Sequence, residues 1–168
     1  CRREYLQRLK EYYLSHEATL CRDCKGRLSR NPLRLLDCKN PACQELVKGA
    51  PRITEYICPD CQAHFAVLKD CLAALQITCE VNPYLVRGLD YYTRTVFEIQ
   101  PVEVGGQSTV GGGGRYDNLI EILDGKPTPA VGFATGIERI ILNLQKQGIE
   151  PPPADAARVY VAHLGLEA

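Results

Sequence analysis

The sequence contains no methionine and no tryptophan, and only three of its 168 residues are phenylalanine. The absence of methionine, together with a first residue that is Cys1, leads us to expect an excised piece of a longer polypeptide. No apolar run approaches the roughly 20 residues that a membrane-spanning helix requires, and no charged-then-apolar signal peptide opens the chain. We therefore expect a soluble, cytoplasmic protein without a membrane partner.

The formal charge is balanced, because 20 Lys and Arg residues stand against 20 Asp and Glu residues. The charge is unevenly distributed, since residues 1–76 carry a net charge of +4 and residues 77–168 carry −4. A basic half beside an acidic half can indicate a polyanion partner on the basic side. Taken alone, however, a charge of this size is more often a solvated surface.

The hydrophobic pattern predicts an α+β protein whose two halves differ in character. Phe65, Leu68 and Leu72 fall at helical spacing and are typical of the first half. Short apolar runs separated by Gly and Pro predict an antiparallel sheet with flanking helices in the second half. The predicted helices are residues 2–15, 18–28, 41–48, 59–76, 116–123 and 136–147, and the predicted strands are 77–81, 95–102, 107–110, 129–134 and 158–163, with a hairpin turn at Gly105-Gly106.

Composition divides the chain into four regions. Residues 1–76 are helical and rich in cysteine, and residues 77–147 mix strands and helices. Residues 148–157, which include the run GIEPPP, have the composition of a linker. Residues 158–168 begin a new strand that has too little chain to bury it.

Cysteine is abundant, with nine residues, of which seven precede residue 62. Six of these seven form the close pairs Cys21/Cys24, Cys38/Cys43 and Cys58/Cys61. An odd total argues against a disulfide framework, whereas thiols in a reducing compartment or a metal site fit the pattern. We select Cys21, Cys24, Cys58 and Cys61 as candidate ligands of a structural zinc, because both pairs have the spacing of zinc knuckles. Cys38 and Cys43 compete for membership, Cys1 could belong to a further pair, and free buried thiols are the alternative.

Residues 84–98, YLVRGLDYYTRTVFE, place an arginine, a glycine, an aspartate and two tyrosines within an apolar strand pattern. Buried polar groups cost free energy unless they are paired, so a plain buried strand would not contain so many. The segment is either a ligand site or a surface loop followed by an ordinary strand. For Arg87, the alternative to a ligand role is a structural salt bridge with Asp90 or Glu98.

Two further segments combine glycine with charged and aromatic residues. In residues 109–119, TVGGGGRYDNL, the glycines allow the backbone to approach a ligand closely. They do not form a dinucleotide-binding fingerprint, because the G-x-G-x-x-G spacing is absent. In residues 131–139, VGFATGIER, a glycine-flanked strand-to-helix turn leaves room for an adenine. The alternatives are a flexible turn for the first segment and a solvated helix face for the second.

The three segments, together and in this order, resemble the histidyl-tRNA synthetases, a family of class II aminoacyl-tRNA synthetases. Residues 87–92, RGLDYY, resemble the first histidine-specific signature of the family, and residues 112–117, GGGRYD, resemble the second. Residues 132–139 resemble class II motif 3, and residues 31–40, NPLRLLDCKN, resemble the insertion domain. Slight departures from the family lie at the edges of the second signature, at Gly111 and Asn118.

The resemblance implies roles for individual residues. Arg87 would be catalytic, because a guanidinium is always ionised and can stabilise charge on the α-phosphate of ATP. The residues implied to bind histidine are Arg87, Tyr91, Tyr92, Gly112, Gly113 and Tyr116, and those implied to bind ATP are Gly136 and Arg139. Adjacent tyrosines on a strand face opposite sides, so Tyr91 and Tyr92 can line one pocket only where the strand is irregular.

The resemblance also implies an activity for the parent protein. It would activate L-histidine with ATP and Mg²⁺ and transfer it to the 3′ end of histidine tRNA, as a cytoplasmic homodimer. Residues 1–76 would be the insertion domain, residues 77–147 the later part of the class II catalytic domain, and residues 158–168 the start of the anticodon-binding domain. Motifs 1 and 2 are missing, so we expect the isolated chain to be inactive and to associate through exposed sheet edges.

Two other interpretations stay open at this point. The first is the regulatory subunit of ATP phosphoribosyltransferase, a non-enzymatic relative that typically departs from the intact signatures. The second is a zinc-binding nucleic-acid module, which the cysteine pairs and the basic half support. This second interpretation leaves residues 84–139 unexplained.

Overall fold

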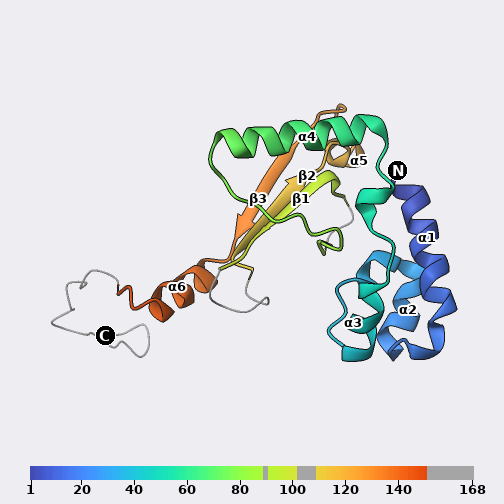
Figure 1. The fold of residues 1–168 in the computed structure, drawn as a ribbon. Helices are drawn as coiled ribbons and strands as arrows, with labels where there is room; N and C mark the ends of the chain where they lie inside the picture. The colour runs from blue at the N-terminus through green and yellow to red at the C-terminus, as the bar shows by residue number, and fades with distance from the viewer. Residues whose placement is uncertain (89–90, 102–108, 151–168) are drawn as a thin grey trace, which may run out of the picture. The chain divides into compact units, whose positions relative to one another are not determined.

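The computed structural model describes residues 1–88, 91–101 and 109–150. Within these ranges the helices are α1 (Arg2–Ser15), α2 (Arg22–Arg30), α3 (Pro41–Lys48), α4 (Pro59–Ala74), α5 (Leu119–Ile122) and α6 (Ile137–Lys146), with short 3-10 helices η1 (Glu17–Thr19), η2 (Pro32–Leu35) and η3 (Ile53–Glu55). Strands β1 (Thr93–Ile99), β2 (Gly111–Arg115) and β3 (Val131–Thr135) lie side by side in one sheet in the order β1-β2-β3 (Figure 1). The predicted α+β class is confirmed.

The described chain divides into two compact units. The first contains residues 1–88, 91–98 and 112–134, and the second contains residues 99–101, 109–111 and 135–150. The predicted turn at Gly105-Gly106 and the predicted strand at 158–163 lie outside the described residues, as does most of the linker 148–157. The domain boundaries derived from the sequence stay a prediction.

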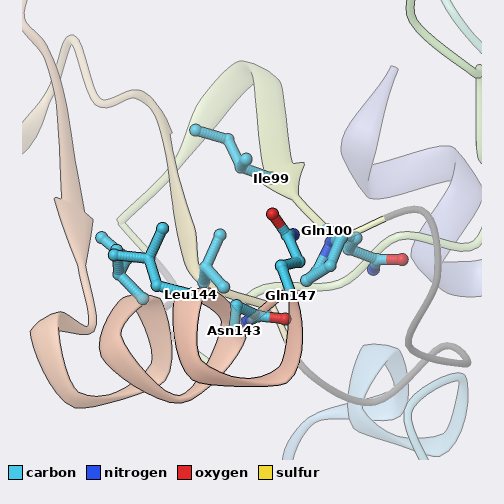
Figure 2. Close-up of a pocket in the computed structure, with 8 residues that line it drawn as sticks. Ile99, Gln100, Asn143, Leu144 and Gln147 are labelled. Atoms are coloured by element: carbon cyan, nitrogen blue, oxygen red, sulfur yellow. The ribbon is translucent and has the colours of Figure 1, made fainter. Parts of the chain in front are cut away.

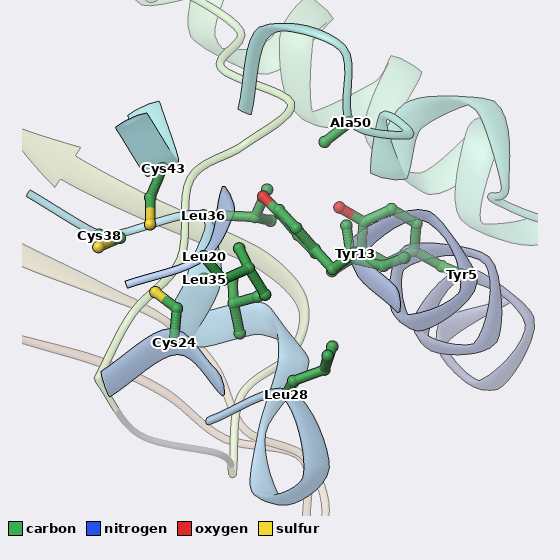
Figure 3. Close-up of a cluster of buried hydrophobic side chains, with 11 residues drawn as sticks. Tyr5, Tyr13, Leu20, Cys24, Leu28, Leu35, Leu36, Cys38, Cys43 and Ala50 are labelled. Carbon is green, nitrogen blue, oxygen red and sulfur yellow. The ribbon is translucent and has the colours of Figure 1, made fainter. Parts of the chain in front are cut away.

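The hydrophobic core of the first unit is built by the helices at its start. Tyr5, Leu9 and Tyr13 recur every four residues, so that they lie on one face of α1 and are fully buried. The buried core consists of Tyr5, Leu9, Tyr13, Leu20, Cys24, Leu28, Leu35, Leu36, Cys38, Cys43 and Ala50 (Figure 3). The sequence predicted the bounds of α1 and α3 correctly. Asn40 caps α3 by accepting a hydrogen bond from the backbone N–H of Ala42, and Pro41 occupies the first turn.

The glycine run is the central strand of the sheet. The backbone N–H of Val110 donates to Ile99 O at 2.9 Å and that of Tyr116 donates to Ala130 O at 2.8 Å, which gives antiparallel pairing on both sides of β2. The predicted return strand at 107–110 is therefore misplaced among the described residues, because β2 begins at Gly111. Glycine occupies this strand for a steric reason, because a Cβ on Gly113 would lie only 2.7 Å from Phe133 Cα. The neighbouring strands approach so closely that hydrogen alone fits.

The predicted strand at 77–81 is wrong. Helix α4 ends at Ala74, and Gln76 adopts a left-handed φ of 57°. The backbone N–H of Ile77 then donates to Leu72 O at 2.9 Å, which is the closing bond of a Schellman motif. Residues 77–82 are exposed and have no strand partner in the described part of the chain. Apolar composition alone does not make a strand without a neighbour to pair with.

No helix among the described residues combines the length and the apolar character needed to cross a membrane.

Candidate functional site

The segment that leads into β1 is anchored on the helical core. The Tyr84 hydroxyl donates to Ala50 O at 3.2 Å, and Arg52 Nε donates to the Tyr84 hydroxyl at 3.4 Å. Tyr84 and Val86 also pack against the buried helical cluster. The backbone that carries Arg87 is therefore held by side chains from the first fifty residues.

Arg87 contacts both β1 and β2. Its Nη1 donates to Oε1 of Glu98 in an ion pair, and only 26% of the Arg87 side chain and 16% of the Glu98 side chain are exposed. The Nε of Arg87 is buried and has no hydrogen-bond partner among the described residues. The guanidinium rests on the backbone of β2, because a Cβ on Gly112 would lie 3.0 Å from Arg87 Cζ. The salt bridge with Glu98 is formed, whereas Asp90 lies outside the described residues.

Three tyrosines form an aromatic cluster beside this arginine. The ring centroids of Tyr91 and Tyr92 are 4.8 Å apart, and Tyr116 lies 5.5 Å from Tyr91 and 6.3 Å from Tyr92. Tyr91 and Tyr92 precede β1, so the alternation of the strand does not separate them. Arg94 has a left-handed φ of 47°, so the start of β1 is itself irregular. Arg2 Nη1 donates to Tyr92 O at 2.9 Å and ties this segment to α1.

The pKa of one tyrosine of the cluster is shifted. A hydrogen bond with Tyr92, followed by burial, raises the pKa of Tyr91 above that of a free phenol. A protonated phenol both donates and accepts a hydrogen bond. The cluster therefore presents hydroxyls that suit a neutral ring with one donor and one acceptor nitrogen.

Glycines form the floor beneath the arginine and the tyrosines. A Cβ on Gly114 would lie 2.9 Å from Tyr92 Cδ1 and 2.6 Å from Thr95 O. A Cβ on Gly132 of β3 would lie 3.2 Å from Tyr116 Cζ. Of the residues proposed from the sequence to bind histidine, the structure brings Tyr91, Tyr92 and Tyr116 together and places Arg87 against Gly112 of β2. Gly113 is the next residue of β2, and a Cβ on it would point to Phe133 of β3. Gly132, which the sequence reasoning gave no site role, completes the floor.

Arg115 and Asp117 organise the turn after β2. Arg115 Nε donates to both carboxylate oxygens of Asp117, at 2.8 and 2.9 Å, and the backbone N–H of Asp117 donates to Thr93 Oγ1 at 3.2 Å. These contacts fix Tyr116 between two anchored residues. Neither residue was assigned a role from the sequence, although both belong to the GGGRYD run at residues 112–117.

The two residues predicted to bind ATP lie in the second compact unit. Gly136 is the N-cap of α6, and its N–H donates to Val110 O at 2.8 Å. Arg139 Nη1 donates to Thr109 O at 2.7 Å.

The second unit also has an apolar hollow of about 190 Å³ beside α6 (Figure 2). It is lined by Ile99, Gln100, Pro101, Val110, Ile140, Asn143, Leu144 and Gln147. Neither predicted ATP-binding residue lines the hollow.

The cysteines gather in two clusters. The first contains Cys21, Cys24, Cys38 and Cys43, and the second contains Cys1, Cys58 and Cys61; within each cluster all sulfur atoms lie within 4.8 Å of one another. All nine cysteines of the chain are free thiols. The four zinc ligands predicted from the sequence are thus divided between the two clusters, because Cys38 and Cys43 lie beside Cys21 and Cys24 in space.

The thiols of the first cluster differ in acidity. A backbone hydrogen bond from Cys24 lowers the pKa of Cys21 to about 7, whereas burial raises the pKa of Cys24 and Cys43.

The comparison with protein families identifies the chain. The family model described as histidyl-tRNA synthetase matches residues 42–140, more than half of the sequence. The chain belongs to the histidyl-tRNA synthetase family. A histidine–tRNA ligase from Dehalococcoides mccartyi is 60% identical over 165 residues, which cover 98% of this chain and 40% of that protein. One from Halothermothrix orenii is 49% identical over 168 residues, covering all of this chain and 40% of that protein.

A solved structure supports the same family. The apo histidyl-tRNA synthetase of Staphylococcus aureus matches with a TM-score of 0.62 and 37% sequence identity, over 89% of this chain and 36% of that one. The chain therefore spans about 40% of the length of the curated synthetases that it matches. The class II character expected from the three sequence motifs is confirmed by this structural likeness.

Proposed function

We propose that this chain supplies the histidine pocket and the catalytic arginine of a histidine–tRNA ligase. The observation that carries the proposal is the convergence of Arg87, Tyr91, Tyr92 and Tyr116 over the glycine strand β2. A purely structural salt bridge would account for Arg87 and Glu98 without three tyrosines around them. Membership of the synthetase family supports the assignment.

Adenylate formation requires the carboxylate of histidine to attack the α-phosphate of ATP. The bond from this carboxylate to phosphorus forms as the bond to pyrophosphate breaks, and negative charge grows on the phosphoryl oxygens. Arg87 is suited to stabilise that charge, because its guanidinium is always ionised and Glu98 anchors it through one nitrogen. Mg²⁺ would accompany ATP and neutralise part of the triphosphate charge.

Histidine recognition follows from the aromatic cluster. Tyr91, Tyr92 and Tyr116 offer aromatic faces for the imidazole ring and hydroxyls for its two nitrogens. Gly112 and Gly113 belong to the proposed site as part of the strand that supports it: a Cβ on Gly112 would lie 3.0 Å from Arg87 Cζ, and one on Gly113 would lie 2.7 Å from Phe133 Cα. We propose Gly136 and Arg139 as ATP-binding residues, with Gly136 opening α6 and Arg139 supplying positive charge for a phosphate.

Further partners follow from the proposed reaction. Histidine tRNA would accept the activated amino acid, and the parent protein would act as a homodimer in the cytoplasm. The curated relatives reported above are named histidine–tRNA ligases, which argues against a regulatory subunit of ATP phosphoribosyltransferase. A nucleic-acid module built only on cysteine pairs gives no reason for the contacts around Arg87.

The experiment is a chimera. Residues 1–168 replace the matching segment of the Dehalococcoides mccartyi ligase, and histidine-dependent ATP–pyrophosphate exchange is measured. Exchange that depends on histidine, and that no other amino acid supports, is the expected result. A folded chimera that binds ATP and histidine without any exchange would contradict the proposal.

A further inference from the structure

Four thiols from three segments of the chain converge inside the helical part of the first unit. Cys21 is the N-cap of α2 and Cys24 lies in its first turn, Cys38 follows η2, and Cys43 lies in the first turn of α3. Their four sulfur atoms all lie within 4.8 Å of one another, and Cys21 Sγ is 3.8 Å from Cys38 Sγ. Figure 3 shows Cys24, Cys38 and Cys43 together at one side of the buried core.

This spacing is that of a tetrahedral metal site. Zinc bound at about 2.3 Å from each of four sulfurs places those sulfurs about 3.8 Å apart. The observed arrangement therefore needs little movement to accept an ion. We propose that Cys21, Cys24, Cys38 and Cys43 bind one structural Zn²⁺ ion as a closed four-cysteine site.

The backbone around the cluster supports thiolate ligands. The N–H of Cys21 lies 3.4 Å from Cys43 Sγ, and the N–H of Asn40 lies 3.4 Å from Cys38 Sγ. Such N–H···S contacts orient and stabilise the sulfurs that bind a metal. The N-termini of α2 and α3 both face the cluster, and a helix N-terminus favours negative charge. A set of sulfur ligands without carboxylates selects zinc over Mg²⁺ or Ca²⁺.

The alternative is a group of buried free thiols. Cys24 is fully buried, and Cys38 and Cys43 are nearly so, which would suit small apolar side chains. Packing alone, however, does not require four sulfurs to point at one position. A disulfide would unite only two of them, at a sulfur–sulfur distance of about 2.05 Å. Metal binding is the one chemistry that uses all four.

The ion would brace a small core. It links α2, the segment after η2 and α3, which contribute Cys24, Leu28, Cys38 and Cys43 to the buried cluster. Small domains often need a metal, because their hydrophobic cores contribute little free energy of folding. Tyr84 and Val86 pack on this same cluster, and they immediately precede Arg87. The zinc would therefore act as a positioning element for the site at β2 without taking part in the chemistry.

The test measures zinc in the whole chain and in serine variants by mass spectrometry of intact protein and by elemental analysis. Cys38→Ser and Cys43→Ser remove ligands of the proposed site. Cys71→Ser and Cys79→Ser are matched controls, because both thiols are exposed and lie outside either cluster. Cys58→Ser separates this site from the four-cysteine set that the sequence alone suggested.

The proposal expects Cys38→Ser and Cys43→Ser each to lose about one equivalent of zinc relative to the unmodified chain. Cys71→Ser and Cys79→Ser should keep the full content, and Cys58→Ser should keep at least about one equivalent. If a ligand variant does not fold, cobalt titration of the unmodified chain and of Cys58→Ser replaces it. Both should then show the visible bands of tetrahedral cobalt–thiolate. Zinc content unchanged in Cys38→Ser, or no such bands in Cys58→Ser, would overturn the proposal.

Discussion

Arg87 and Glu98 form a sheltered ion pair in which Nη1 of the arginine donates to Oε1 of the glutamate. Glu98 belongs to β1, whereas Arg87 lies in the segment before it, so the pair fixes the arginine against the sheet. The Nε of Arg87 has no hydrogen-bond partner among the described residues. The carboxylate thus anchors one nitrogen of the guanidinium at the sheet.

Replacing Glu98 should misplace Arg87 without removing it. In the chimera with the Dehalococcoides mccartyi ligase, we expect Glu98→Gln to lower kcat for pyrophosphate exchange by about 10- to 100-fold, because small displacements of a catalytic group cost this much. The KM for histidine should change less. Glu80→Gln is the matched control, because Glu80 is exposed and lies outside the site. An equal loss in both variants, or a change confined to KM, would argue against positioning by Glu98.

The central strand should tolerate no side chain at Gly114. A Cβ there would lie 2.6 Å from Thr95 O and 2.9 Å from Tyr92 Cδ1. We expect Gly114→Ala to lower the free energy of unfolding by about 1 to 3 kcal/mol, as overpacking of a tight site does. Gly26→Ala is the control, since a Cβ on Gly26 in α2 has no atom within 4 Å. It should raise stability by about 0.5 to 1 kcal/mol. Urea unfolding measures both, and a Gly114→Ala chain as stable as the control would contradict the packing described here.

The isolated chain should associate through β3. Val131 and Phe133 are 74% and 72% exposed on this strand, and strand edges with exposed apolar side chains pair with other copies. We expect light scattering to report oligomers of the unmodified chain and a smaller average mass for Phe133→Lys. Val67→Lys is the control, because Val67 is 61% exposed and belongs to α4, not to a strand. A monomeric unmodified chain, or an equal effect of the two lysines, would point to another contact.

Removal of metal should loosen one part of the chain. If zinc binds Cys21, Cys24, Cys38 and Cys43, a chelator should speed amide hydrogen exchange in residues 1–50 and in residues 84–87, which pack on the same core. Amide hydrogen exchange in α6 should not change, because no residue of α6 belongs to that core. Uniform acceleration across the chain would mean that the ion does not act locally.

The sequence predicted the helices best where apolar spacing and caps agree. The predicted bounds of α1 and α3 agree with the structure, in which Tyr5, Leu9 and Tyr13 bury one face of α1 and Asn40 caps α3 ahead of Pro41. The strands were harder to predict, because a strand depends on its neighbours. The apolar run at 77–81 has no partner in the described chain, while the glycine run at 111–114, which has no strand propensity, forms the middle of the sheet.

The candidate site could be assembled from sequence motifs, but its geometry could not. The motifs named Arg87 and the tyrosines, and the structure adds the support of Arg87 by Glu98 and the floor at Gly132. For the cysteines, the spacing in the sequence pointed to the wrong partners. Spacing along the chain favoured Cys58 and Cys61 as partners of Cys21 and Cys24, whereas the turn after η2 brings Cys38 and Cys43 to that pair instead. Sequence separation does not report which loops meet in space.

The measurement that tests the central claim most directly is histidine-dependent pyrophosphate exchange by the chimera carrying Arg87→Ala. The claim is that Arg87 stabilises the transition state at the α-phosphate, so the variant should lose about 100-fold or more in kcat. Its affinity for histidine, measured by calorimetry, should change far less. Arg30→Ala is the control, because Arg30 is exposed at the end of α2 and is not among the proposed site residues. Exchange by Arg87→Ala at close to the unmodified rate would contradict the account.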